Sequence, residues 1–293
     1  MKTPPDLDGR FSVDANASGN LMKGPLLTSE LHAALVAAAR SGAKTLGCSL
    51  DLGRSTTTVY LDAAAWHWRG ESFAYPQACK ERTIYQWVDG DFAPVARFTT
   101  SLVKLVPTQY GPPTFEIDGI KMLPTARESP YEDARRKVEL IRPCGKVILD
   151  TCGGLGYFAA WCVKHRARQV LSYEINPDVI WLRSVNPWSP PIGDGLSLKN
   201  ADISDEIGRM ADQSVDAILH DPPRFGIAGD LYAQAFYDEL ARVIRPKGRL
   251  FHYTGAPNKL TSGRDVSAEV AKRLRFAGFA TSHHGDGVLA IRA

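Results

Sequence analysis

The feature that most constrains the fold is an apolar run that ends in an acid and leads into a glycine-rich turn. Residues 147–149 are apolar, Asp150 follows them, and three glycines lie within residues 153–156, before the helix-forming run Tyr157–His165. Glycines allow a sharp turn and a close approach of the backbone to a ligand, and the N-terminus of the next helix offers unpaired N–H groups. This stretch therefore predicts a strand, a ligand-binding turn and a helix of an α/β sheet.

A second acid lies where nucleotide-binding sheets hold a ribose. The run Gln169–Glu174 predicts the next strand and ends in Glu174, about 20 residues beyond the turn. In such folds an acid at this point accepts hydrogen bonds from the ribose hydroxyls. Both features also fit a dinucleotide-dependent dehydrogenase, so they do not decide the cofactor by themselves.

A third motif argues against a dehydrogenase. The apolar run Val215–Leu219 is followed by His-Asp-Pro-Pro-Arg-Phe at residues 220–225. An acid and two prolines at the carboxyl end of a strand resemble the (Asp/Asn)-Pro-Pro-aromatic motif of class I S-adenosylmethionine-dependent methyltransferases, which nicotinamide enzymes do not require. The glycine turn, the two acids and this motif, in this order, favour S-adenosyl-L-methionine as the cofactor.

Composition and charge favour an ordinary soluble protein and do not support an obligate nucleic-acid binder. The 293 residues, 44% of them apolar and 23% charged, are typical of a soluble globular protein of two domains or of one domain with an extension. The formal charge of +3 is far from the strongly basic character of obligate nucleic-acid binders. Neither a signal peptide nor a membrane-spanning run is evident, so we expect a cytoplasmic protein. The five scattered cysteines lack Cys-x-x-Cys spacing and predict neither a disulfide framework nor a metal site.

Three parts are predicted along the chain. Residues 1–24 are polar and are expected to form a disordered tail, residues 25–115 a mixed-β N-terminal domain, and residues 116–293 the S-adenosylmethionine-binding catalytic domain. The N-terminal domain is expected to begin with a helix over Thr28–Arg40, capped by Thr28 or Ser29. Its strands are predicted from short β-branched or aromatic runs. These runs are Lys44–Leu52, Ser55–Leu61, Ala65–Arg69, Thr83–Val88, Phe92–Phe98 and Leu102–Val106.

The expected fold class is α/β, a doubly wound Rossmann-like class I methyltransferase sheet with a small mixed-β N-terminal domain. A helix is predicted to begin at Ser129-Pro130, and a turn at Pro246–Gly248 is expected to lead into a strand over Arg249–Tyr253. The chain is predicted to finish with an antiparallel hairpin of Phe279–His283 and Val288–Arg292. That finish is a habit of class I methyltransferases rather than of dehydrogenases.

With these residues in view, residues 44–293 resemble an archaeal-type family of predicted class I S-adenosylmethionine-dependent methyltransferases that is described as spermidine-synthase-like. The resemblance depends on six motifs. They are Ser49–Gly53, Ile117–Met122, Leu149–Tyr157, Asn186–Ser189, His220–Phe225 and Leu250–Gly255. The chain departs from the family pattern at Gly153, where a threonine is expected, and at Leu123, where a histidine is expected. The second departure leaves no basis for a role of residue 123.

The resemblance implies a set of cofactor-binding residues. Asp150, Gly154 and Gly156 are expected around the methionine moiety, and Glu174 at the ribose hydroxyls. Ile175 is expected to pack on the adenine ring. Asp202 resembles the acid that accepts a hydrogen bond from the adenine amino group, and the alternative for Asp202 is a cap of the helix that follows it.

The Asp-Pro-Pro motif implies where the acceptor binds. In related amino-methyltransferases the carboxylate and a proline carbonyl hold the target amine, which assigns these roles to Asp221 and Pro222. Arg224 occupies the position of the usual aromatic residue, with Phe225 displaced by one, and both are expected to contact the substrate. Because arginine binds a carboxylate or phosphate with two hydrogen bonds, an anionic small molecule that carries an amine is favoured over a flipped nucleobase. The alternative is an ion pair of Arg224 with a structural acid.

Three further residues follow strands at the same edge of the predicted sheet. His220, His252 and Tyr253 are placed to act as a general base or as substrate donors. For the histidines, the alternative is a core position satisfied by a backbone carbonyl. Trp188 is expected to form a wall of the site, with coverage of the sheet edge as its alternative.

Three functions stay open on this basis. The favoured one is methyl transfer to a nitrogen of a small amine or amino-acid-like anionic metabolite, and the others are aminopropyl or aminocarboxypropyl transfer of spermidine-synthase type and RNA or nucleobase N-methylation. Aminopropyltransferases usually place a pair of acids where this chain has prolines and arginine after Asp221, and basic residues are not concentrated in the N-terminal domain. A small molecule is the expected partner. A nucleic acid is an unsupported alternative, no membrane is expected, and a homodimer is an open alternative.

Overall fold

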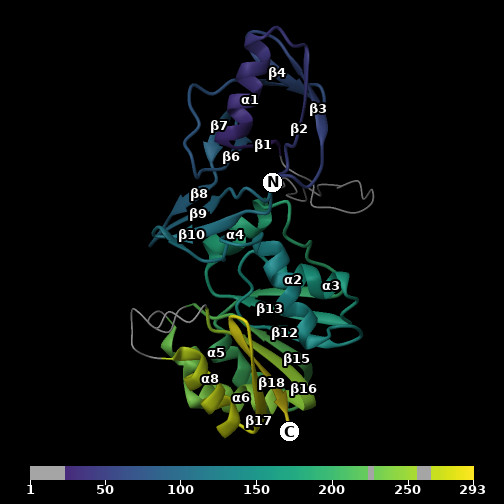
Figure 1. Cartoon of the computed structure of the whole chain (residues 1–293), viewed down its shortest axis with the longest axis vertical. Coiled ribbons are helices and arrows are strands. Elements are labelled where there is room, and N and C mark those ends of the chain that lie inside the picture. The colour runs from purple at the N-terminus through teal and green to yellow at the C-terminus, as the bar shows by residue number, and fades with distance from the viewer. Residues whose placement is uncertain (1–23, 224–227, 256–264) are drawn as a thin grey trace, which may run out of the picture.

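The carboxyl-terminal part of the chain forms one seven-stranded sheet, and the computed structural model describes residues 24–223, 228–255 and 265–293 (Figure 1). The strand order is β14-β13-β12-β15-β16-β18-β17, with the first five strands parallel and β18 antiparallel to both of its neighbours. The strands are β12 (Val147–Asp150), β13 (Gln169–Glu174), β14 (Leu196–Asn200), β15 (Val215–His220), β16 (Ile244–Tyr253), β17 (Phe279–His284) and β18 (Gly287–Arg292). The predicted doubly wound sheet and its antiparallel closing hairpin are confirmed.

Helices cover both faces of this sheet, because successive strand residues point to opposite faces. Ile148 packs into the hydrophobic cluster that contains α2, α3 and α4, and Leu149 packs into the cluster that contains α5, α6 and α8. The helices are α2 (Pro130–Ile141), α3 (Tyr157–Lys164), α4 (Pro177–Val185), α5 (Ile203–Glu206), α6 (Gln234–Val243) and α8 (Val266–Phe276), with 3-10 turns at Ile207–Arg209 and Gly229–Tyr232. The inner strands β12 and β15 are buried on both sides, as expected for a parallel sheet.

Side-chain caps set two of the predicted helix starts. The Thr28 Oγ1 accepts a hydrogen bond from the Leu31 backbone N–H at 3.2 Å, and α1 spans Ser29–Arg40. The Ser129 Oγ accepts from the Glu132 N–H at 3.0 Å, and α2 follows it with Pro130 at its first position. Both predicted starts are confirmed, and Thr28 is the cap where the sequence left two candidates.

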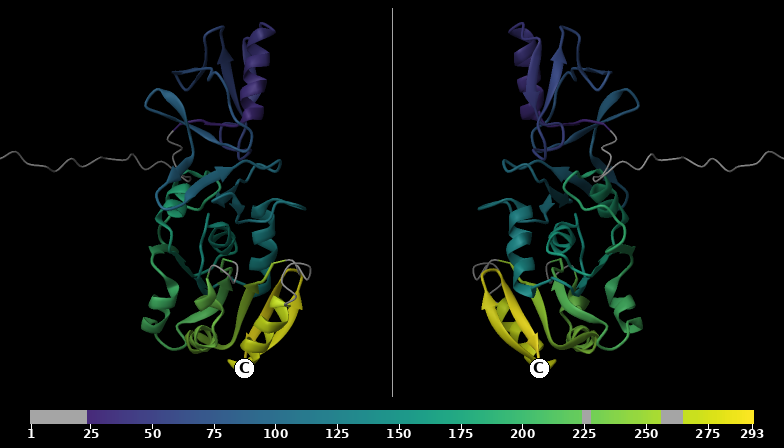
Figure 2. Two further views of the ribbon diagram at one scale, coloured as in Figure 1. Left: turned by 90° about the vertical axis from the view of Figure 1, so that its left-hand side faces the viewer. Right: turned by 90° about the vertical axis from the view of Figure 1, so that its right-hand side faces the viewer.

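The N-terminal strands form three further sheets. Figures 1 and 2 place β2–β7 at one end of the long axis, the seven-stranded sheet at the other, and β8–β10 between them. The sheets are β2-β3-β4-β5, β1-β6-β7 and β11-β10-β9-β8. Their strands are β1 (Leu26–Leu27), β2 (Thr45–Cys48), β3 (Thr57–Leu61), β4 (Ala65–Trp68), β5 (Glu71–Ala74), β6 (Tyr85–Val88), β7 (Asp91–Pro94), β8 (Ala96–Phe98), β9 (Leu102–Val106), β10 (Thr114–Ile117) and β11 (Ile120–Lys121). Because the predicted boundary between residues 115 and 116 falls inside β10, we propose that the boundary lies after Lys121.

Some boundaries differ from the sequence predictions. The run 92–98, predicted as one strand, is split into β7 and β8 of two different sheets, and Pro94, which has no N–H to donate, ends the first of them. The predicted turn at Pro246–Gly248 is part of β16, whose register with β15 shifts there while Lys247 adopts a φ of +63°. The predicted tail lies outside the described residues as far as residue 23.

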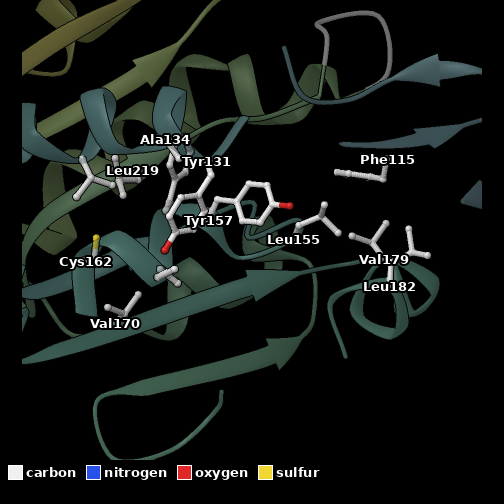
Figure 3. Close-up of a cluster of buried hydrophobic side chains, with 14 of the residues drawn as sticks. Phe115, Tyr131, Ala134, Leu155, Tyr157, Cys162, Val170, Val179, Leu182 and Leu219 are labelled. Atoms are coloured by element: carbon white, nitrogen blue, oxygen red, sulfur yellow. The ribbon is translucent and has the colours of Figure 1, made fainter. Parts of the chain in front are cut away.

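The sheet β11-β10-β9-β8 shares a hydrophobic core with the glycine-rich turn that follows β12. Phe115 of β10 belongs to the same buried cluster as Leu155, Val179 and Leu182. Figure 3 shows Phe115 at the same side of this cluster as Val179 and Leu182. The Tyr157 hydroxyl donates to the Pro113 carbonyl at 2.8 Å. The N-terminal strands therefore pack directly against the turn that follows β12.

In the part of the chain that the structure describes, no helix is both long enough and apolar enough to cross a membrane.

We expect Ile148→Ala to lower the free energy of unfolding by about 2–5 kcal/mol, because Ile148 is fully buried in the central strand and its loss leaves a cavity. Chemical denaturation measures this change. Ile192→Ala is the matched control, since Ile192 is 63% exposed, and it should stay within about 0.5 kcal/mol. Equal effects of the two substitutions would contradict the placement of Ile148.

Candidate active site

The turn after β12 leads into α3, and this helix begins without a side-chain cap. Gly154 and Gly156 adopt φ values of +49° and +80°, and Gly156 precedes α3 without a side-chain hydrogen bond to the helix. Such φ values favour glycine. The helix N-terminus is therefore open toward the carboxyl ends of the strands, where open α/β sheets bind ligands.

Two carboxylates flank this turn. Asp150 ends β12 and is fully buried, and its Oδ2 accepts a hydrogen bond from the Ser172 hydroxyl at 2.8 Å. Its Oδ1 has no hydrogen-bond partner among the described residues. Glu174 ends β13 and accepts hydrogen bonds from the Gly154 N–H at 3.0 Å and the Asn176 N–H at 2.9 Å. The structure thus brings together Asp150, Gly154 and Glu174, and their contacts with a cofactor stay predictions.

Burial makes both carboxylates more basic. It raises the pKa of Asp150 to about 6, and the charge of Arg183 and the Ser172 hydrogen bond oppose this rise. Burial also raises the pKa of Glu174, against the hydrogen bonds from Asn176 and Gly154. An unpaired, buried carboxylate oxygen beside a glycine turn suits a cationic ligand.

Arg183 is a component of this site that the sequence analysis missed. It comes from α4, is only 3% exposed, and donates from Nη1 to the Ser172 Oγ at 3.2 Å. Its Nε and Nη2 have no hydrogen-bond partner within the described ranges. Nothing in the sequence distinguishes Arg183 from an exposed helical arginine, since only the packing of α4 turns it inward.

The residues expected at the adenine lie at the adjoining strand ends. Ile175 directly follows β13 and is 60% exposed. Asp202 caps α5, with its Oδ1 accepting from the backbone N–H and the hydroxyl of Ser204, both at 2.8 Å. The capping alternative for Asp202 is therefore observed, and contacts of Ile175 and Asp202 with an adenine stay predictions.

Asp221 follows β15 at the same edge of the sheet. Burial raises its pKa to about 7, Lys137 lowers it, and Asp133, Asp150 and Asp286 raise it further. Pro222 is buried, and the Pro223 carbonyl accepts a hydrogen bond from the Tyr232 hydroxyl at 3.2 Å. Arg224 and Phe225, the expected substrate contacts, lie outside the described residues.

A buried lysine beside Asp221 was also missed. The Lys137 Nζ lies 2.6 Å from the Asp133 Oδ2 and 3.8 Å from the Asp286 Oδ2. It also lies 3.6 Å from the centre of the Tyr253 ring. Lys137 therefore joins α2 to the end of β16 and to the closing hairpin, and it places Tyr253 beside a charged cluster. The i, i+4 spacing of Asp133 and Lys137 was visible in the sequence, but their burial was not.

The structure places His220, which was expected as a general base, inside the core. His220 is 1% exposed, with its Nδ1 2.7 Å from the Thr151 Oγ1 and its Nε2 3.1 Å from the Leu231 carbonyl oxygen. Because a carbonyl oxygen only accepts, Nε2 carries the proton and Nδ1 accepts from the Thr151 hydroxyl. Burial holds the pKa of His220 well below its usual value. Both ring nitrogens are occupied inside the core.

The structure also places His252, which was expected to bind substrate, inside the core. Its Nδ1 donates to the Tyr253 carbonyl at 2.8 Å, and its Nε2 lies 3.1 Å from the Tyr237 hydroxyl, which donates to it. Its side chain is fully buried, and this burial lowers its pKa to about 4. The core alternative therefore holds for both histidines.

Trp188 joins the N-terminal loops to the sheet. Its Nε1 donates to the Leu52 carbonyl at 3.0 Å, and its backbone N–H donates to the Asn186 Oδ1 at 3.1 Å. Its ring centre lies 5.2 Å from that of Tyr131. These contacts place Trp188 between the N-terminal loops and α2, and its role as a wall of the site stays a prediction.

Within the described ranges, no group of three or more His, Cys, Asp or Glu side chains is arranged to hold a metal ion.

Comparison with known proteins places this geometry in context. Uncharacterized protein MJ1233 of Methanocaldococcus jannaschii is 40% identical over 215 residues, which cover 73% of this chain and 74% of that protein. No protein-family model matches the chain.

Two solved structures share the fold. A spermidine synthase in complex with the transition-state analogue AdoDATO aligns with 68% of this chain and 73% of its own, with a TM-score of 0.54 and 14% identity. The spermidine synthase of Thermotoga maritima aligns with 71% of this chain and 78% of its own, with a TM-score of 0.50 and 14% identity. At this identity the likeness shows the fold alone, and it confirms the spermidine-synthase-like part of the resemblance at that level.

The structure accounts for glycine at position 153, where the family resemblance predicts threonine. A Cβ atom there would lie 2.3 Å from the buried Ser172 Oγ and 3.1 Å from the Arg183 Nη1. We expect Gly153→Ala to lower the free energy of unfolding by about 1–3 kcal/mol, through overpacking and loss of the Ser172 to Asp150 hydrogen bond. Gly208→Ala, with open space at its Cβ, is the control for chemical denaturation. A neutral Gly153→Ala would show that Ser172 is free to move.

The low pKa of His252 predicts a specific pH dependence of stability. Its folded pKa of about 4 lies below the ordinary 6.5, so the unfolded chain binds the extra proton and stability falls as the pH drops from 6.5 to 4. The contribution is about 3 kcal/mol over that window. Denaturation at pH 7 and pH 4.5 should show a smaller loss on acidification in His252→Asn than in wild type, whereas the exposed-residue control His284→Asn should behave as wild type. An unchanged loss in His252→Asn would contradict the buried neutral imidazole.

Proposed function

This chain belongs to the protein family of Uncharacterized protein MJ1233 from Methanocaldococcus jannaschii, and from its site we propose that it is an S-adenosylmethionine-dependent methyltransferase that acts on a nitrogen atom. The observation that carries this proposal is the convergence of Asp150, the glycine turn and Glu174 at one sheet edge, with Asp221 at the end of the neighbouring strand.

The residues around the turn fit this cofactor. Its ammonium group and its ribose hydroxyls are donors, and the site offers the unpaired Oδ1 of Asp150 and the carboxylate of Glu174 as acceptors. Asp150 would hold the ammonium, Glu174 the ribose, and the backbone of Gly154 and Gly156 the methionine moiety. When bound, S-adenosylmethionine supplies an electrophilic methyl group on a sulfonium.

Asp221 is the residue that would act on the acceptor. Its pKa of about 7 leaves a substantial ionised fraction at neutral pH, so the carboxylate can accept a hydrogen bond from an amine and take up its proton. Positioning of the amine is the main task in such a transfer. Arg224 would bind an anionic group of the same molecule. We propose a small amine or amino-acid-like anion as the substrate class.

The test is calorimetric titration with S-adenosylmethionine and, separately, with its decarboxylated form. We expect binding of the intact cofactor, weakened about 10- to 100-fold in Glu174→Ala by loss of charge-assisted hydrogen bonds. Asp221→Ala is the matched control at the same sheet edge. This variant should keep the cofactor affinity within a few-fold while abolishing methyl transfer, because it removes only the Asp221 carboxylate that would bind the acceptor amine.

Three results would count against the proposal. A preference for the decarboxylated form would favour aminopropyl transfer of spermidine-synthase type. Absence of binding to the wild-type protein would remove the cofactor assignment. Full methyl transfer by Asp221→Ala would remove the role of Asp221.

A further inference from the structure

Arg183 fills a slot beneath the glycine turn that only glycines leave open. A Cβ atom at Gly156 would lie 2.5 Å from the Arg183 Cζ and 2.6 Å from its Nε, and one at Gly153 would lie 3.1 Å from its Nη1. Two glycines of the turn are therefore in contact with one buried guanidinium. The glycines are required here by the arginine as well as by the backbone conformation of Gly156.

The guanidinium is linked to the Asp150 carboxylate through Ser172. Arg183 Nη1 donates to the Ser172 Oγ at 3.2 Å, and that hydroxyl donates to the Asp150 Oδ2 at 2.8 Å. The positive charge of Arg183 acts on Asp150 and on Glu174, and lowers the pKa of both carboxyls against the effect of burial. A buried arginine without ionised acids beside it would be strongly destabilising. The three charges therefore depend on one another.

The N-terminal strands hold the helix that carries Arg183. The Thr99 Oγ1 donates to the Asp178 Oδ2 at 2.6 Å, at the start of α4. The guanidinium of Arg97 lies 3.9 Å from the centre of the Trp181 ring, one turn further along the helix. These two contacts fix α4 from outside, while Arg183 projects from it toward the turn.

We propose that Arg183 is a positioning residue of the cofactor site, which holds the glycine turn in shape and, through Ser172, holds the Asp150 carboxylate in place for the bound cofactor. The inference rests on the proposed function for the identity of the cofactor, S-adenosylmethionine. Arg183 acts through the two carboxylates, so its removal should change the pH at which the cofactor binds as well as the affinity.

The sign of this pH effect follows from the groups around Asp150. Its titratable neighbours are Arg183 from α4, Glu174 from β13, Asp221 after β15, and the thiols of Cys152 and Cys162. Burial raises the pKa of both thiols, which stay neutral. Cofactor affinity should fall as the pH drops and Asp150 takes up a proton. Without the charge of Arg183 the pKa of Asp150 rises further, so the affinity should fall at a higher pH.

The first experiment is calorimetric titration with S-adenosylmethionine between pH 5.5 and 8.5. Arg183→Met, which keeps most of the side-chain volume, should weaken binding about ten-fold at pH 7 and move the midpoint of the acid loss upward by about one pH unit. Arg183→Lys, which keeps the charge, should restore the wild-type midpoint. Arg166→Met, at an exposed arginine on the loop after α3, is the control and should bind as wild type.

Folded Arg183→Met with wild-type affinity and midpoint would overturn the role of Arg183 and leave the proposed function intact. Wild-type protein that bound no S-adenosylmethionine at any pH would instead overturn the proposed function. An equal loss in Arg183→Lys and Arg183→Met, with no shift of the midpoint, would reduce Arg183 to a packing residue.

A second experiment tests the slot itself without any cofactor. Gly156→Ala should lower the midpoint of thermal unfolding by several degrees in the wild-type background and by less than half as much in Arg183→Ala. The strain of the positive φ at residue 156 is common to both backgrounds, so the difference isolates the contact with the guanidinium. Equal effects in the two backgrounds would show that Arg183 does not occupy the slot.

Discussion

The structure depends on the burial of charge at the carboxyl end of the central strand. Asp150 is fully buried there, and the nearby Arg183 and Glu174 share the same small region. Buried charges are tolerated only when other charges and hydrogen bonds compensate them. Ser172 supplies one such bond to Asp150, and the glycines of the turn make room for the guanidinium. The same arrangement leaves one carboxylate oxygen of Asp150 without a hydrogen-bond partner in the described structure.

The N-terminal strands contact the elements that form the candidate site. Phe115 packs into the same core as the residues that follow the glycine turn, and Thr99 and Arg97 contact the outer side of α4. Trp188 adds a third contact between the N-terminal region and the sheet domain, through its hydrogen bond to the Leu52 carbonyl. Displacement of these strands would therefore move both the turn and the helix beneath it. This explains why a β-rich extension accompanies a sheet that already has helices on both faces.

The elements predicted most reliably from the sequence are those whose local pattern is compatible with one structure only. The glycine turn, the strand ends at Asp150 and Glu174, and the capped starts of α1 and α2 were all predicted, because spacing and capping chemistry act within a few residues. It failed for the histidines. Their position at strand ends gave equal support to catalysis and to the core, and only the partners Thr151, Leu231 and Tyr237 decided for the core. Arg183 and Lys137 went unnoticed because a helical cation looks exposed until its neighbours are known.

By itself, the sequence determined the α/β class, the succession of strands and helices along the chain and the positions of the acids at the strand ends, since hydrophobic periodicity and glycine placement are local properties. Only the tertiary structure decided which face of each helix is buried and which charges meet. Asp150, Ser172 and Arg183 come from three different elements, and their contact exists because β12 pairs with β13 and α4 packs back against β13. Contacts of this kind depend on the register of strands and the rotation of helices, which no single segment of the sequence encodes.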